Sequence, residues 1–233
     1  MPFYLTMIER LFMQIAIVLY PGMTALDAVG PYEVLRMIPD SEIRFVSREP
    51  GPIMSDSGVL VLGATHSYEA TPSPDIILVP GSAANTGKAM ADEALIAWLQ
   101  RTHLGSLWTT SVCSGALVLA VAGILNGRPA TTHWIAQDLL AAFGATARRD
   151  QRIVQSGKVV TAAGVSAGID LALWMVGQIC GAERAEVVQL LIEYDPQPPF
   201  NAGHPGKASK QVFEIAQAEM LNRSKNFIEG TAT

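Results

Sequence analysis

The chain has 233 residues, of which 49% are hydrophobic, and its formal net charge is -5. This length and apolar content are sufficient for one large domain with a substantial core. The negative charge and the lack of any Lys/Arg run argue against nucleic acid as a partner. Two cysteines are too few for a disulfide framework, so we expect reduced thiols and a cytoplasmic location.

Residues 1–12 are expected to be an N-terminal extension of the domain. They carry Glu9 and Arg10 where a signal peptide would be apolar, and no small-residue cleavage site follows. A second segment, residues 104–127, has no charged residue and is long enough for a membrane span. Its first half is rich in Ser, Thr and β-branched residues, which favours a buried strand followed by a buried helix. No membrane partner is therefore expected.

Strand and helix patterns alternate along the rest of the chain. The apolar run at residues 13–20 is followed by Pro-Gly, and the run at 75–82 contains Pro-Gly near its end. Continuous apolar runs of this kind are typical of strands buried on both faces. Further strands are expected at residues 43–47, 59–65 and 107–112, with a hairpin at 152–164. Helices are expected at residues 25–36, 93–102, 115–122, 135–143, 167–180 and 182–194.

This alternation predicts a single α/β domain over residues 13–233, with a mostly parallel sheet and helices on both faces. A Pro/Gly-rich tail after Asp195 is expected to cross the surface before a last helix. In such a sheet, ligands bind beyond the carboxyl ends of the strands. The turns at these ends supply the chemically notable residues, which are Asp27, Gly81, Ser82, Cys113 and Ser114.

Cys113 stands where a β-branched strand gives way to a helical pattern. A sharp turn there would expose the side chain at the top of the sheet, as in the nucleophile elbow of hydrolases. The first turn of a helix favours a thiolate and offers N–H groups to an anion. The alternative is a buried structural cysteine, which is the interpretation we favour for Cys180 within an apolar helix.

Two other candidates have structural alternatives. Asp27 lies three residues after Thr24, so the pair fits a helix capping box as well as a functional acid. His133 follows another strand and is expected either to line a pocket or to be a structural histidine. The remaining histidines have no metal-ligand spacing, so no metal is expected at His66, His103 or His204.

Four stretches resemble the ThiJ/PfpI superfamily. They are LDAVGPYEVL, DIILVPGS, TSVCSGALVLAVAGILNGRPATTHW and GVSAGIDLAL, and the similarity runs from about residue 13 to residue 194. The resemblance implies a flavodoxin-like, class I glutamine amidotransferase-like fold with a cysteine at the elbow. Asp27, Ser114, ATTHW and the tail PPFNAG are most similar to the subgroup that hydrates isocyanides.

That resemblance implies a nucleophile at Cys113 and an acid at Asp27, which together convert an isocyanide into an N-substituted formamide through a thioimidate. Ser114 would replace a threonine hydroxyl, and Gly81, Ser82 and His133 would contact the substrate. A homodimer without cofactor or metal is implied. The superfamily usually has Gly-Gly where this chain has Gly81-Ser82, so a positive φ at Ser82 would be strained.

Three other functions fit the same elbow. A glyoxalase-like or other cysteine hydratase is one, although its acid is usually a glutamate rather than Asp27. A non-catalytic redox sensor, with Cys113 oxidised to a sulfinate, is the second. The third is the ligand-sensing half of a transcription regulator, for which the residues after Asp195 are too few. A Cys-His peptidase is disfavoured because Ser114, not histidine, follows the cysteine.

Overall fold

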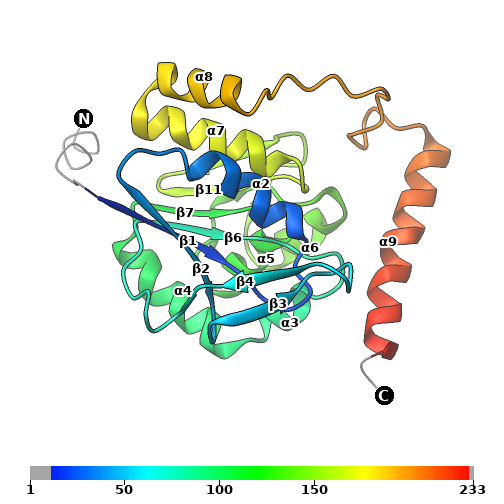
Figure 1. Cartoon of the computed structure of the whole chain (residues 1–233). Helices are drawn as coiled ribbons and strands as arrows, with labels where there is room; N and C mark the ends of the chain where they lie inside the picture. The colour runs from blue at the N-terminus through cyan, green and yellow to red at the C-terminus, as the bar shows by residue number, and fades with distance from the viewer. Residues whose placement is uncertain (1–11, 231–233) are drawn as a thin grey trace.

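A seven-stranded sheet forms the centre of the computed structural model, which describes residues 12–230 (Figure 1). Its strands are β1 (Met13–Val18), β2 (Ser41–Ser47), β5 (His66–Ser67), β6 (Ile76–Val79), β7 (Trp108–Ser111), β10 (Ile153–Ser156) and β11 (Val159–Ala162). They lie in the order β10-β11-β7-β6-β1-β2-β5. Neighbours are parallel except for the β10–β11 hairpin, which confirms the predicted mostly parallel sheet.

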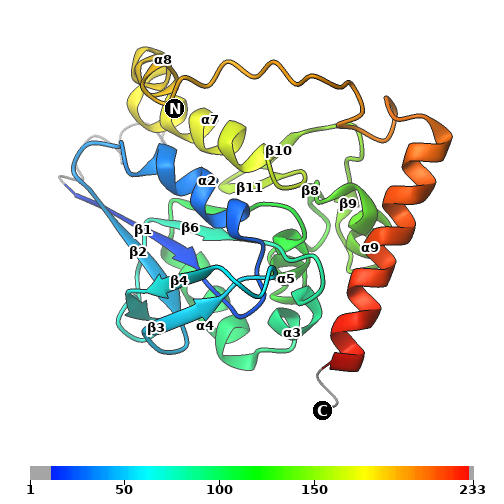
Figure 2. The ribbon, with the colours of Figure 1, turned by 45° about the vertical axis from the view of Figure 1, so that its right-hand side comes forward.

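Helices cover both faces of this sheet (Figures 1 and 2). One face carries α2 (Ala25–Leu35), α7 (Ala167–Cys180) and α8 (Ala182–Leu191). The other carries α3 (Thr86–Met90), α4 (Glu93–Gly105), α5 (Gly115–Val121), the short 3-10 helix η1 (Trp134–Ala136) and α6 (Gln137–Ala142). The central strands β1 and β6 are buried between the two layers, as their continuous apolar runs predict. The predicted α/β class with helices on both faces is therefore confirmed.

The strand predicted within residues 59–65 is confirmed, but it lies outside the central sheet. The strand there, β4 (Val61–Ala64), pairs antiparallel with β3 (Gly51–Met54) in a separate two-stranded sheet. Its side chains are partly exposed, unlike those of a strand buried on both faces. A further small sheet of two residues a strand joins β8 (Pro129–Ala130) to β9 (Thr146–Ala147), and it was not predicted because such short strands have no periodicity.

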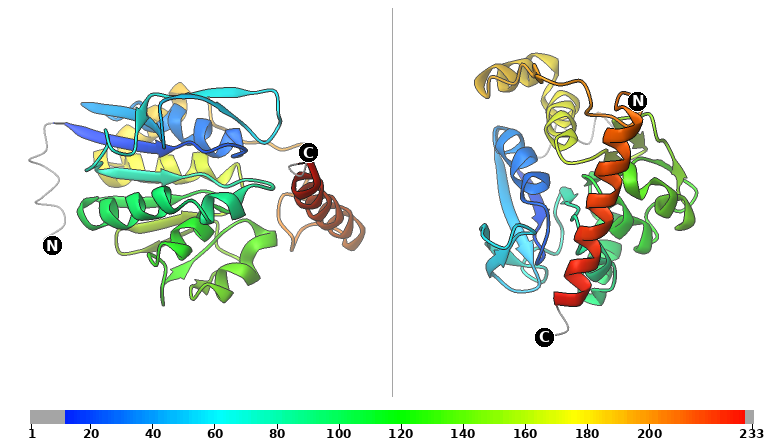
Figure 3. Two further views of the ribbon diagram at one scale, coloured as in Figure 1. Left: turned by 90° about the horizontal axis from the view of Figure 1, so that it is seen from below. Right: turned by 90° about the vertical axis from the view of Figure 1, so that its right-hand side faces the viewer.

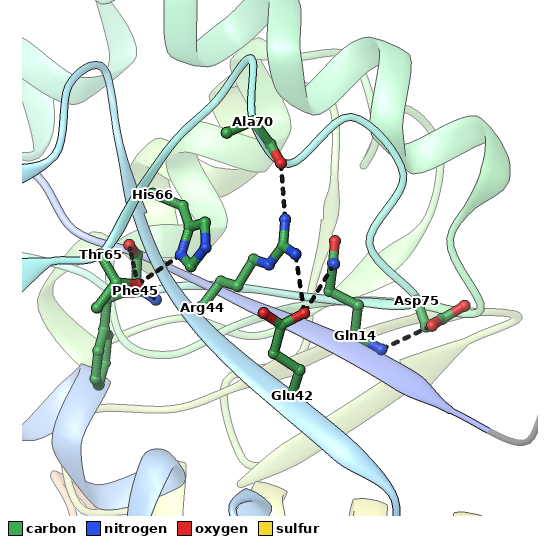
Figure 4. Close-up of polar contacts among 8 residues, drawn as sticks. All are labelled: Gln14, Glu42, Arg44, Phe45, Thr65, His66, Ala70 and Asp75. Carbon is green, nitrogen blue, oxygen red and sulfur yellow. Dashed lines mark hydrogen bonds and ion pairs between the residues drawn. The ribbon is translucent and has the colours of Figure 1, made fainter.

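A polar network fastens the first two strands to the loop before β6 (Figure 4). Gln14 of β1 donates to Glu42 of β2 at 3.2 Å across the strand pair, and Arg44, also on β2, forms an ion pair with the same carboxylate at 3.0 Å. The Arg44 guanidinium also donates to the Ala70 carbonyl at 2.7 Å. The backbone N–H of Gln14 donates to Asp75 at 2.8 Å, just before β6 begins. These contacts lie at the amino ends of β1 and β6, whereas the candidate residues lie at the carboxyl ends.

After α8 the chain leaves the body of the domain. Residues 195–209 form no helix or strand and lead to α9 (Lys210–Gly230), as predicted for the tail. Figure 3 places α9 beside the carboxyl ends of the strands. Phe213 of α9 packs against Trp134, with ring centroids 5.2 Å apart. The predicted extension 1–12 lies outside the described residues except for Phe12.

The uncharged segment 104–127 forms the end of α4, strand β7 and helix α5, which confirms a buried strand followed by a buried helix. Within residues 12–230, no helix has both the length and the apolar character needed to cross a bilayer.

Candidate active site

Cys113 lies on the turn between β7 and α5. Its φ of 57° is in the left-handed region, which turns the chain sharply from strand to helix. The backbone N–H of Cys113 donates to the Ala163 carbonyl at 2.9 Å and so fixes the turn against the residues that follow β11. Gly115 is required by close approach, because a Cβ there would lie 2.2 Å from the Val79 carbonyl oxygen. The predicted elbow is therefore present.

Asp27 lies in the first turn of α2 and is completely buried. Its Oδ2 accepts a hydrogen bond from the Gly81 N–H at 2.9 Å. Its Oδ1 has no N–H or O–H donor among the described residues. The capping-box alternative is wrong, because the Thr24 hydroxyl donates to Asp56 at 2.6 Å instead of closing the helix end. The carboxyl is left to face the Cys113 thiol, with which it interacts.

Burial dominates the protonation of this pair. It raises the pKa of Asp27 from its ordinary 3.8 to about 7, although hydrogen bonds from Gly81 and Cys113 oppose the shift. Burial, followed by the charge of Asp27, raises the pKa of the Cys113 thiol well above its usual range. The expected thiolate at a helix end is thus opposed by desolvation. At neutral pH the thiol therefore holds its proton, and the ionised fraction of Asp27 beside it is the group that can accept it.

The Gly81-Ser82 turn after β6 organises the site's own side chains. The Gly81 N–H is used by Asp27, and the Ser82 N–H donates to the Ser114 hydroxyl at 3.0 Å. A Cβ at Gly81 would lie 2.5 Å from the Ser114 nitrogen, so only glycine fits against the elbow. Both N–H groups therefore donate to side chains of the protein itself, whereas the resemblance implied that Gly81 and Ser82 contact the substrate.

The strain expected at Ser82 is absent. Positive φ values of described non-glycine residues occur at Asp40, Cys113, Val165 and Glu193, not at Ser82. The Ser82 hydroxyl donates to the Gly22 carbonyl at 2.5 Å and accepts from the Asn85 N–H at 2.8 Å. These hydrogen bonds of the Ser82 side chain stabilise the loop that leads into α3.

A cavity of about 560 Å³ opens over Cys113. Its polar end is formed by Cys113, Ser82, Ser114 and Thr86. Its apolar wall includes Met90, Leu117, Ile135, Leu139 and Phe143, with Met220 and Leu221 from α9. No sequence signal pointed to the α9 residues, which lie more than a hundred residues after the cysteine. A helix that belongs to the tail consequently forms part of the cavity wall.

His133 lines this cavity and also caps η1, where its Nδ1 accepts from the Ile135 N–H at 3.5 Å. Burial lowers its pKa, which favours the neutral ring. Both interpretations of His133 therefore hold in part. Cys180, by contrast, lies half-buried at the end of α7 and does not line the cavity.

Two further residues of the site were missed in the sequence. The Thr86 hydroxyl lies 2.7 Å from the Ser114 hydroxyl, and the buried Tyr20 phenol donates to the Pro80 carbonyl at 3.0 Å. Tyr20 follows β1 at the same edge of the sheet, and this position is the sequence feature that could have identified it. Thr86 has none, because α3 begins within a run of small residues.

The parallel sheet, the left-handed cysteine elbow and the buried acid beside it together define a class of α/β proteins with a cysteine at the elbow. The sequence profile of the DJ-1/PfpI family matches residues 13–178, and the chain belongs to that family.

The relatives include proteins of different activity. An isonitrile hydratase from Pseudomonas putida is 40% identical over 205 residues, which cover 88% of this chain and 89% of that protein. The crystal structure of a ThiJ/PfpI family protein from Pseudomonas syringae matches with a TM-score of 0.87 and 36% identity, over 92% of this chain and 88% of that one. An HTH-type transcriptional regulator from Pseudomonas aeruginosa is 28% identical over 72% of this chain but only 51% of its own length.

Proposed function

We propose that this chain is an isocyanide hydratase that converts isocyanides, also called isonitriles, into N-substituted formamides. The observation that carries the proposal is the buried carboxyl of Asp27 beside Cys113, with one oxygen anchored and a pKa raised to about 7. The relationship to the Pseudomonas putida enzyme supports the same reaction. An acid that is protonated near neutral pH is suited to giving a proton to carbon.

The first step forms a bond between Cys113 and the substrate. The Asp27 carboxylate first takes the proton of the Cys113 thiol. The terminal carbon of an isocyanide is electrophilic, and the thiolate sulfur adds its electron pair to it. Asp27 gives its proton to that carbon, so the developing carbanion is quenched as the C–S bond forms. The product is a thioimidate, in which the carbon carries one hydrogen, the sulfur and a double bond to nitrogen. Asp27 is now a carboxylate.

The second step uses water. The Asp27 carboxylate takes a proton from water while the oxygen adds to the thioimidate carbon, and that proton is passed to the nitrogen. When the C–S bond breaks, the thiolate leaves with its electron pair and the hydroxyl proton returns to Asp27. The N-substituted formamide, the thiolate and the carboxylic acid are regenerated in balance. No cofactor or metal takes part in this scheme.

The other site residues have supporting roles in the proposal. Gly81 holds the Asp27 carboxyl, and the Ser114 hydroxyl tunes the sulfur, whose pKa it lowers in part. The apolar wall of the 560 Å³ cavity receives the N-substituent of the isocyanide, with Ser82 and His133 at its edge. Because the wall is apolar, desolvating an uncharged N-substituent there is favourable.

A homodimer in the cytoplasm is part of the proposal. Large apolar side chains are exposed on α8 and the tail, among them Leu190 at 80%, Leu191 at 65% and Phe200 at 82% exposure. An apolar surface of this kind is typical of an interface. Both cysteines are free, which fits a reducing compartment. Light scattering of the purified chain tests the dimer, and a monomer at micromolar concentration contradicts it.

The decisive experiment is an assay against a small panel of isocyanides and 2-oxoaldehydes, with the formamide identified by mass spectrometry and NMR. Formamide production that requires Cys113 supports the proposal. Turnover of the 2-oxoaldehydes alone replaces it with a glyoxalase-like activity. If neither class is turned over while peroxide oxidises Cys113 selectively, the redox-sensor alternative takes its place.

A further inference from the structure

The Ser114 hydroxyl has more possible acceptors around it than it has protons to donate. Its Oγ accepts from the Ser82 N–H at 3.0 Å. It also lies 3.1 Å from the Ser82 carbonyl oxygen and 2.7 Å from the Thr86 hydroxyl. The same hydroxyl is in hydrogen-bonding contact with the Cys113 sulfur. Ser114 has a single proton, so only one of these acceptors receives it.

The destination of that proton affects the thiolate. A hydroxyl that donates to an anionic sulfur stabilises it, because hydrogen bonds to charged groups are stronger than neutral ones. A hydroxyl that donates to the Ser82 carbonyl leaves the sulfur without this stabilisation. A serine side chain has three staggered rotamers and a freely rotating proton, so the choice depends on its neighbours.

Thr86 is the neighbour that biases the choice. It is the first residue of α3, is 8% exposed and lines the same cavity. Its hydroxyl has a short contact of 2.7 Å with Ser114 and a longer one of 3.1 Å with the Ser82 carbonyl. It also contacts the Tyr20 phenol, whose own proton is directed to the Pro80 carbonyl. Ser114 is thus a nearer acceptor for the Thr86 proton than the Ser82 carbonyl.

We propose that Thr86 is a positioning residue: its hydroxyl donates to Ser114 and thereby directs the Ser114 proton to the Cys113 sulfur when that sulfur is anionic. With the Ser82 N–H and the Thr86 O–H both donating to it, the Ser114 oxygen has both lone pairs occupied. A negative charge on the sulfur polarises this chain in the same direction. The inference rests on the proposed nucleophilic role of Cys113.

The test measures the reactivity of Cys113 directly. In a Cys180→Ser background, the alkylation rate with iodoacetamide is followed from about pH 6 to 10 by mass spectrometry. Thr86→Val keeps the shape and removes the hydroxyl. It should lower the rate at neutral pH by roughly three- to tenfold and shift the pH profile upward by about 0.5–1 unit. Thr86→Ser keeps the hydroxyl and should restore both.

The effect must pass through Ser114. In a Ser114→Ala background, Thr86→Val should therefore change neither the rate nor the profile, since the residues of one chain are not additive. A Thr86→Val profile identical to that of the parent overturns the proposal, as does an equal shift in the Ser114→Ala background. Urea unfolding identifies a variant that fails to fold, and Thr86→Ala then replaces the valine variant. Because iodoacetamide needs no isocyanide, failure here is distinguishable from failure of the hydratase assay.

Discussion

The Gly81 N–H donates to Asp27 Oδ2 at 2.9 Å, although the two residues are 54 positions apart in the sequence. This bond anchors one carboxyl oxygen to the turn after β6 and leaves the other without an N–H or O–H donor among the described residues. An anchored acid is oriented before the substrate arrives, so less orientational freedom is lost on reaching the transition state. The positions of Asp27 and of the elbow therefore depend on the same turn.

Cys113→Ala should abolish formamide production, because the variant lacks the nucleophile that forms the thioimidate. Cys180→Ser is the matched control, since Cys180 lies on α7 away from the cavity, and it should retain turnover. Formamide is quantified by mass spectrometry after incubation with an isocyanide. Residual turnover in Cys113→Ala beyond the uncatalysed rate contradicts the proposed nucleophile.

Asp27→Asn should lower kcat by roughly 10²–10⁴, the usual range for loss of a general acid or base. The amide keeps the shape of the carboxyl but cannot transfer its proton. Combining it with Cys113→Ala should cost little beyond Cys113→Ala alone, because the two residues act as one unit. Steady-state kinetics measure both effects, and an Asp27→Asn enzyme of full activity eliminates the proposed acid.

The raised pKa of Asp27 also predicts how stability depends on pH. Between its ordinary 3.8 and about 7, the native state binds a proton that the unfolded chain has released. The free energy of unfolding should therefore fall as pH rises through this window and level off above it. Asp27→Asn removes this contribution. Between about pH 4.5 and 8 its stability relative to wild type should rise by on the order of a few kcal/mol.

Urea denaturation at these pH values measures that difference. Asp138→Asn is the matched control, because the Asp138 side chain is 91% exposed and should show no such trend. A constant difference between wild type and Asp27→Asn across the window contradicts the raised pKa.

Gly81→Ala should damage both stability and activity. The new Cβ would lie 2.5 Å from the Ser114 nitrogen and 2.9 Å from the Cys113 Cβ, so the elbow must shift. We expect a loss of about 1–3 kcal/mol, as for overpacking, together with at least a tenfold lower kcat. Gly63→Ala in β4 is the control, because nothing lies within 4 Å of its added Cβ. Urea unfolding and kinetics compare the two, and equal effects refute the close approach.

Leu221→Ala should weaken substrate binding rather than destabilise the fold. Leu221 lines the cavity from α9 and is 53% exposed, so its truncation removes little buried surface of the protein itself. KM should rise by roughly three- to tenfold for an isocyanide with a bulky apolar substituent, and little for a small one. Ile215→Ala, on the same helix at 52% exposure but outside the cavity lining, should leave KM unchanged.

The sequence alone was sufficient to predict the features that depend on neighbouring residues in the chain. Helix α7 begins and ends where it was predicted, at Ala167 and Cys180, because the apolar pattern stops at Gly181, whose φ of 90° favours glycine. The elbow was likewise predicted, since a β-branched strand followed by small residues is a local pattern. Cys113 and Asp27 were identified because both follow strands of a parallel sheet, whose carboxyl ends share one edge.

The protonation of Cys113 and the hydrogen-bonding partners of the site residues could be determined only from the tertiary structure. The pattern at Thr24 and Asp27 fits a capping box, but Asp56, from a distant turn, takes the Thr24 hydroxyl. A helix end favours a thiolate at Cys113, yet burial raises the pKa of the thiol, and burial depends on every layer that packs around it. Thr86 lies in a run of small residues with no sequence pattern, and the helix that carries Leu221 was predicted without any sign of where it packs. Local periodicity determines which elements form, whereas solvent exclusion and long-range hydrogen bonds exist only once those elements have packed.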